Sequence, residues 1–126
     1  MIGSTRNLVV YAYTAPCDMR KGFDGLSALV IHGLGRDPLS GEVFLFTSRN
    51  RKRAKVLHWD GTGLCIYAKR LERECFACLW DEQRNAPLQL TMSELQLYLE
   101  GSKLVGRVEL SPPVFQQKPV ASMLAV

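Results

Sequence analysis

The sequence predicts an α+β domain in which a curved antiparallel sheet, or a partly open barrel, packs on one main helix, with a short helix near the C-terminus. Three observations support this class: short apolar segments separated by turn residues, one segment with helical periodicity, and a capping motif near the end. The chain has 126 residues, of which 47% are hydrophobic, so we expect a single globular domain over residues 1–101. Residues 102–126 lack periodicity and are expected to form an extended tail that could be mobile.

The first strand and the main helix are predicted from two different periodicities. Residues Leu8–Tyr13 are apolar, β-branched or aromatic and stop shortly before Pro16, which is typical of a strand. Asp18 is the expected N-cap of the helix that follows, and Gly33 or Gly35 is its expected end. Apolar residues then recur at helical spacing at four positions: Phe23, Leu26, Val30 and Leu34.

The middle of the chain is expected to form the rest of the sheet. Val43–Phe46 is apolar at every position, which predicts a strand covered on both faces. A basic stretch separates it from Val56–Trp59, which predicts a long hairpin with a cationic tip. Two further strands are expected at Leu64–Tyr67 and Cys75–Trp80. An antiparallel meander is the simplest topology for these segments.

A capping motif predicts the short C-terminal helix. Thr91-Met92-Ser93-Glu94 matches the capping box, in which a threonine hydroxyl and a glutamate carboxylate each accept a hydrogen bond from an otherwise unpaired backbone N–H. We expect the helix to continue through Tyr98, with Gly101 immediately beyond its end.

Positive charge is concentrated in one part of the sequence. The formal net charge is +4, but residues 49–73 hold eight basic and two acidic residues, a net +6, and the remainder is −2. We expect this segment to contact the phosphate backbone of DNA with little sequence specificity. The alternatives are a solvated hairpin tip that protects a strand edge, and a binding surface for an acidic protein. The predicted DNA-binding residues are Arg20, Lys21, Arg49, Arg51, Lys52, Arg53, Lys55, Lys69, Arg70 and Arg73.

The segment Asp18–Gly25 places two carboxylates, two cations and two glycines at the start of the main helix. A capped helix entry with Arg20 paired to a carboxylate is the favoured interpretation, and a phosphate-contact site is the alternative. The glycine spacing matches neither a phosphate-binding loop nor a dinucleotide fingerprint.

No catalytic residue, metal site or cofactor is predicted, and we do not expect an enzyme. Cys75 and Cys78 would lie on opposite faces of a strand and have no second ligand pair, so all four cysteines are expected to be reduced thiols. His32 and His58 are expected to be packed residues. The remaining catalytic alternative is a magnesium-dependent nuclease that uses acidic residues: Asp18, Asp24, Asp60 and Asp81.

Three aromatic residues offer a different function. Trp59, Tyr67 and Trp80 are of the types enriched at protein interfaces. A protein-interaction module is therefore the alternative to DNA binding. The sequence opens without a basic-then-apolar leader and has no apolar run of the roughly 20 residues that span a bilayer, so we expect a cytoplasmic protein with no membrane partner.

Four segments of the chain, residues 18–26, 37–46, 55–64 and 67–72, resemble one family closely. They are similar to the Orf2-type accessory proteins of the IS66 family of insertion sequences, over a match that runs from about Leu8 to Gly101. The chain departs from that family after Gly101, where similar members carry an arginine-rich segment and this tail is nearly neutral. The positions that carry the resemblance are Arg20, Lys21, Asp24, Lys55, Trp59, Asp60, Lys69 and Arg70.

The resemblance implies a small protein, encoded beside a separate and larger transposase, that supports transposition and has no assigned catalytic residues. The partners it implies are the transposase and the other accessory protein of the same element. DNA at the element ends or at the target is the expected nucleic acid, and a homo-oligomer is a further possibility.

Overall fold

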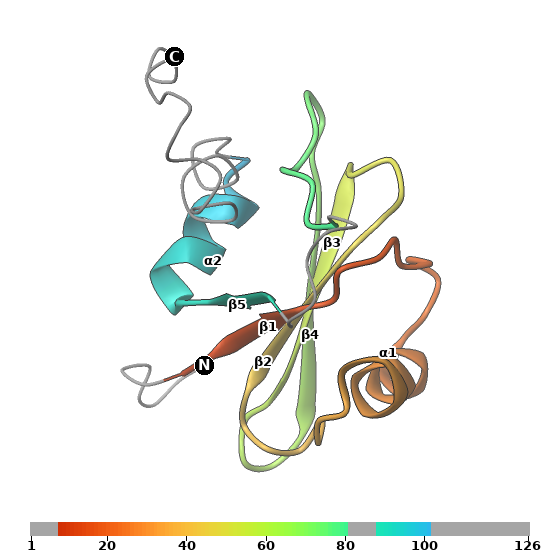
Figure 1. The fold of residues 1–126 in the computed structure, drawn as a ribbon, viewed down its shortest axis with the longest axis vertical. Helices are drawn as coiled ribbons and strands as arrows, with labels where there is room; N and C mark the ends of the chain where they lie inside the picture. The colour runs from red at the N-terminus through yellow and green to blue at the C-terminus, as the bar shows by residue number, and fades with distance from the viewer. Residues whose placement is uncertain (1–7, 81–87, 102–126) are drawn as a thin grey trace.

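The computed structural model describes residues 8–80 and 88–101, so the predicted tail at 102–126 and Asp81 lie outside the described residues. A five-stranded sheet in the order β4-β3-β2-β1-β5 forms the centre of the molecule, with α1 and α2 on opposite sides of it (Figure 1). The elements are β1 (Val10–Ala12), α1 (Phe23–Leu29), η1 (Val30–Leu34), β2 (Val43–Thr47), β3 (Arg53–Trp59), β4 (Leu64–Arg70), β5 (Leu88–Leu90) and α2 (Met92–Leu99).

The sheet is mixed, which corrects the expectation of a wholly antiparallel one. β2, β3 and β4 form the predicted antiparallel meander, and β5 pairs antiparallel with β1. β1 and β2 are parallel, with Val10 opposite Val43, because the chain crosses the sheet through α1 between them. The sheet is not closed into a barrel. The α+β class and the short C-terminal helix are confirmed.

β2 is buried on both faces, as its continuous apolar sequence predicts. Val43 and Leu45 belong to the core on the α2 side, whereas Phe44 and Phe46 belong to the core on the α1 side. All four side chains have no exposed surface. This strand therefore joins the two cores of the domain.

The main helix packs three of its four periodic residues, Leu26, Val30 and Leu34, on the sheet, whereas Phe23 at its start is 50% exposed, contrary to the expectation. Leu26 and Val30 are fully buried against Phe44 and its neighbours. From Val30 the helix continues as a π-helical turn, η1. It ends at Gly35, whose left-handed backbone (φ 65°) is a conformation that glycine adopts at little cost.

The segment 75–80 is not a strand, contrary to the prediction. Phe76 and Leu79 are both buried in the α2-side core, and residues three apart in a strand would face opposite ways. The Phe76 N–H instead donates one hydrogen bond to the Arg51 carbonyl (2.7 Å). The Phe76 ring stacks on Tyr98 of α2 at a centroid distance of 5.2 Å.

α2 begins with the predicted capping box. Thr91 Oγ1 accepts from the Glu94 N–H (3.1 Å), and the Glu94 carboxylate accepts from the Thr91 N–H (2.8 Å). Gly101 follows the helix with φ 85° and donates to the Tyr98 carbonyl (2.9 Å), as expected of the residue beyond the C-cap.

Candidate nucleic-acid interface

One end of the sheet collects the basic residues. β1, β2 and β4 end there and β3 and β5 begin there, so the loops 13–22, 48–52 and 71–80 adjoin the same end of the sheet. Apart from Arg36, every Lys and Arg of the described residues lies at this end or within three residues of it. Arg36 lies in the connection between η1 and β2 and is paired with Glu42 through two hydrogen bonds of 2.8 and 2.7 Å. We call this end of the molecule the basic end.

A shallow groove of about 420 Å³ opens at the basic end. Arg20, Arg49 and Arg53 line it together with Asn50 and Asp18, and we call it the arginine groove. The side chains of Arg49 and Arg53 have no hydrogen-bond or ion-pair partner within the described part of the chain and are exposed. Arg20 and Arg49, which are 29 positions apart in the sequence, therefore line the same groove.

Local hydrogen bonds fix the backbone of the hairpin loop that carries the arginines. Ser48 Oγ accepts from the Arg53 N–H (3.1 Å), and Asn50 Oδ1 accepts from the Lys52 N–H (3.0 Å). The Ser48 N–H donates to the Arg53 carbonyl (2.9 Å). These contacts close a tight polar turn, which is the predicted cationic tip.

On the other side of the groove, Asp18 turns toward Arg20 and does not cap the helix as expected. Its carboxylate accepts from the Arg20 backbone N–H (2.9 Å) and from the guanidinium (2.9 and 3.1 Å). The N-cap position is Gly22, which makes no side-chain cap. The Arg20 side-chain hydrogen bond is the main reason why the pKa of Asp18 is lowered to about 2. The Arg20 side chain is 91% exposed, and exposed pairs of this kind exchange partners at little cost.

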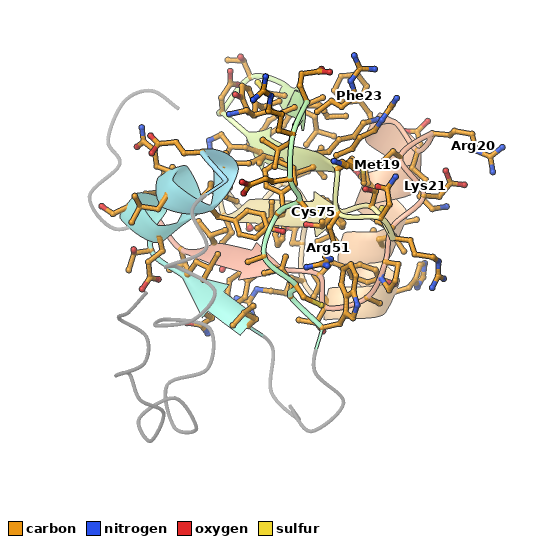
Figure 2. The ribbon with its side chains drawn as sticks, turned by 90° about the horizontal axis from the view of Figure 1, so that it is seen from above. Met19, Arg20, Lys21, Phe23, Arg51 and Cys75 are labelled. Atoms are coloured by element: carbon orange, nitrogen blue, oxygen red, sulfur yellow. The ribbon has the colours of Figure 1, made fainter. Side chains whose placement is uncertain are left out.

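Four of the predicted DNA-binding residues make side-chain hydrogen bonds within the protein. Each donates to a backbone carbonyl: Arg51 to Phe76 (3.2 Å), Lys52 to Glu74 (2.7 Å), Lys55 to Lys21 (2.9 Å) and Lys69 to Leu99 (2.8 Å). These contacts tie the hairpin to the neighbouring loops, and they tie β4 to the end of α2. Figure 2, which looks onto the basic end, shows Arg51 beside Cys75 and Arg20 extending away from the body.

Arg53 and Arg70 are direct cross-strand partners on the α1 face of β3 and β4. Like charges placed directly opposite each other destabilise a sheet, so this pair has a cost in the free protein. Arg70 is partly neutralised by Glu72 (3.1 Å), in a pair that is more than half exposed on both sides. Arg73 is exposed beyond the end of β4. Lys69 faces the α2 side, since neighbouring residues of a strand alternate.

The three aromatic residues predicted for protein contacts are not brought together. Tyr67 is opposite Val56 and therefore faces the α2 side, where it is 54% exposed. Trp59 is three residues from Val56 on β3 and faces the other side. Trp80 is partly buried against the α2-side core. They do not form one interface patch.

The described residues contain no group of three His, Cys, Asp or Glu side chains that could hold a metal ion. The four cysteines are free thiols, with Cys17 buried. Asp18 lies at the basic end and Asp60 at the opposite end, in the turn between β3 and β4. Those two carboxylates therefore do not share a site. Within the same residues, none of the helices has the length and apolar character needed to cross a membrane.

Comparison with known proteins adds the family. No solved structure matches the chain. Two curated proteins of Sinorhizobium fredii are similar to it, the uncharacterised proteins y4jC and y4hO; each is 34% identical over 101 residues, covering 80% of this chain and 85% and 86% of the respective relative. The family model described as IS66 Orf2 like protein matches residues 8–108. The match contains the whole sheet, both helices and the basic end, and the chain therefore belongs to the IS66 Orf2-like family of insertion-sequence proteins.

Proposed function

We propose that the chain is a non-catalytic accessory factor of transposition that binds the DNA backbone through its basic end. The transposase and the other accessory protein of the element are its proposed protein partners. The observation that carries the proposal is the opposition of Arg53 and Arg70 beside the arginine groove. Such a pair lowers stability in the free protein, and an anion placed between the two guanidinium groups would remove the repulsion.

The arrangement favours phosphate contacts over base readout. Arg20, Arg49 and Arg53 are exposed around a shallow groove and are carried by loops or by a strand end. α1 and α2 each pack one side on the sheet, and the three arginines that line the groove come from loops or a strand end, not from a projecting helix. DNA would therefore be bound by charge, with low sequence specificity and strong dependence on salt.

Fluorescence anisotropy tests the proposal with an element-end duplex and an unrelated duplex of equal length. Four to six phosphate contacts give a slope of log affinity against log salt of about −4 to −5. Substituting Arg20, Arg49 or Arg53 by Gln is expected to weaken binding to both duplexes equally and to reduce the slope by about 1 each.

Arg36→Gln is the matched control, because it removes one positive charge from outside the basic end. It is expected to leave the slope unchanged while the variant remains folded. Arg53→Gln adds a second readout: its urea midpoint should stay equal or rise while DNA affinity falls, since it relieves the repulsion with Arg70. Absence of binding at low salt, a flat slope, or an equal effect of Arg36→Gln and Arg53→Gln would contradict the proposal.

A further inference from the structure

β4 is an outer strand of the sheet that the described residues form. In the strand order it has β3 on one side, and no strand of the described residues pairs with its other side. Its seven residues, Leu64–Arg70, contain neither proline nor glycine and pair with β3 in unbroken register. Proteins often protect such an edge with a proline, a bulge or a very short strand. β4 has none of these features, so it is suited to receive another strand.

The hydrogen-bond pattern shows which backbone groups point outward. The Leu71 N–H donates to the Lys52 carbonyl (2.8 Å), and the Asp60 N–H donates to the Gly63 carbonyl (3.1 Å). Because the bonds of an antiparallel ladder alternate, Tyr67 directs its N–H and C=O toward β3. Its neighbours on each side, Ile66 and Ala68, direct theirs to the open edge.

The surface beside this edge is largely apolar and includes an exposed tyrosine. Tyr67 is 54% exposed, and next to it a groove of about 550 Å³ runs between the sheet and α2, lined by Val56, Leu95 and Leu99 among others. His58 also lines this groove, and its Nδ1 is buried without a hydrogen-bond partner in the described part of the chain. An exposed tyrosine beside an apolar groove is a frequent anchor of protein interfaces.

We propose that β4 pairs antiparallel with β4 of a second copy of this chain, about a twofold axis that passes through Tyr67. In this register Ile66 of each copy lies opposite Ala68 of the other, so that the outward N–H and C=O groups of both residues are paired. The two Tyr67 residues face each other as a non-hydrogen-bonded pair. The two sheets then become one continuous sheet with a self-complementary interface.

Charge favours a second copy in this orientation. The basic residues Lys69 and Arg70 occupy one end of β4, and the Asp60 turn adjoins its other end. Antiparallel pairing places Lys69 of the second copy opposite Cys65, whose Sγ lies 3.5 Å from Asp60 Oδ2. A parallel arrangement would instead place the two basic ends side by side.

Sedimentation of the full chain at rising concentration provides the first test, and the expected result is a dimer. Ala68→Pro removes an N–H that points away from β3, so it leaves the internal ladder intact but blocks edge pairing. We expect it to raise the dimer dissociation constant at least about tenfold, because two symmetry-related hydrogen bonds are lost. Ala68→Val keeps the N–H and is expected to remain dimeric, and thermal unfolding checks that both variants are folded.

A cross-linking test examines the register. In a background in which Cys65, Cys75 and Cys78 are replaced by Ser, Tyr67→Cys places a thiol on the axis, where it meets its own counterpart at disulfide distance. Oxidation should therefore yield a covalent dimer. Ala68→Cys in the same background lies opposite Ile66 and should cross-link far less.

Two results would overturn the inference. The first is a monomer at every concentration, and the second is a dimer that is insensitive to Ala68→Pro. The readouts are oligomeric state and cross-linking, so they fail or succeed independently of DNA binding.

Discussion

The Tyr98 hydroxyl lies 2.8 Å from Thr47 Oγ1, a buried contact that joins α2 to the last residue of β2. The same hydroxyl donates to the Ala77 carbonyl (3.0 Å), so Thr47 is the donor in the first contact. The Tyr98 side chain thus connects α2, β2 and the irregular segment 75–80 near the basic end. The Tyr98 ring has no exposed surface, and burial is the main reason why its pKa is raised.

Tyr98→Phe is expected to lower the free energy of unfolding by about 1–3 kcal/mol, because the Thr47 hydroxyl and the Ala77 carbonyl lose their partner in a buried place. Urea unfolding measures the loss. Thr47→Val serves as the matched single variant, and the double variant should cost less than the sum of the two. Additive costs would show that the two residues act separately.

Arg36→Lys is expected to lower the urea midpoint of unfolding without changing the slope of log DNA affinity against log salt. Arg36 makes two hydrogen bonds with Glu42 (2.8 and 2.7 Å) and stacks on the Tyr11 ring, with its guanidinium carbon 4.0 Å from the centroid. A lysine keeps the charge but can reproduce neither the paired bonds nor the planar stacking. A midpoint equal to that of the unmodified chain would mean that charge alone accounts for the contact.

Asp60 is expected to make stability depend on acid pH. Backbone hydrogen bonds, first from Thr62 and then from Gly63, lower the pKa of Asp60 to about 2, whereas in an unfolded chain its pKa is about 4. A folded-state pKa below the unfolded one gives stability that is complete above pH of about 4 and is lost as pH falls toward 2. The stability difference between the unmodified chain and Asp60→Ala should therefore shrink over this window in urea titrations. A difference that stays constant down to pH 2 would contradict the assignment.

Much of the fold could be predicted because the relevant signals are local. The Thr91 and Glu94 capping box depends on residues three apart, and the burial of β2 on both faces follows from its unbroken apolar sequence. The parallel pairing of β1 with β2 was missed, although a helix between two neighbouring strands indicates it. β5 was missed because three residues, Leu88–Leu90, are too few to show a periodicity.

The candidate site was predicted in part. Charge density located the hairpin tip, but sequence could not separate Arg49 and Arg53, which are exposed at the groove, from Lys55 and Lys69, which hold backbone carbonyls. That difference depends on which carbonyl lies within reach after folding. The meeting of Arg20 with the hairpin likewise depends on the parallel crossover, which brings the loop after β1 beside the loop after β2.

Within residues 8–80 and 88–101, most basic side chains lie at the basic end, whereas Asp37, Glu42 and Asp60 lie at the opposite end, so this part of the molecule has a permanent electrical polarity. Near a polyanion this charge distribution orients the protein before contact, so a larger share of collisions has a productive orientation. For the proposed complex with DNA, the rate of encounter should consequently fall with ionic strength more steeply than the lifetime of that complex, as the screening length shortens to about 8 Å at physiological salt.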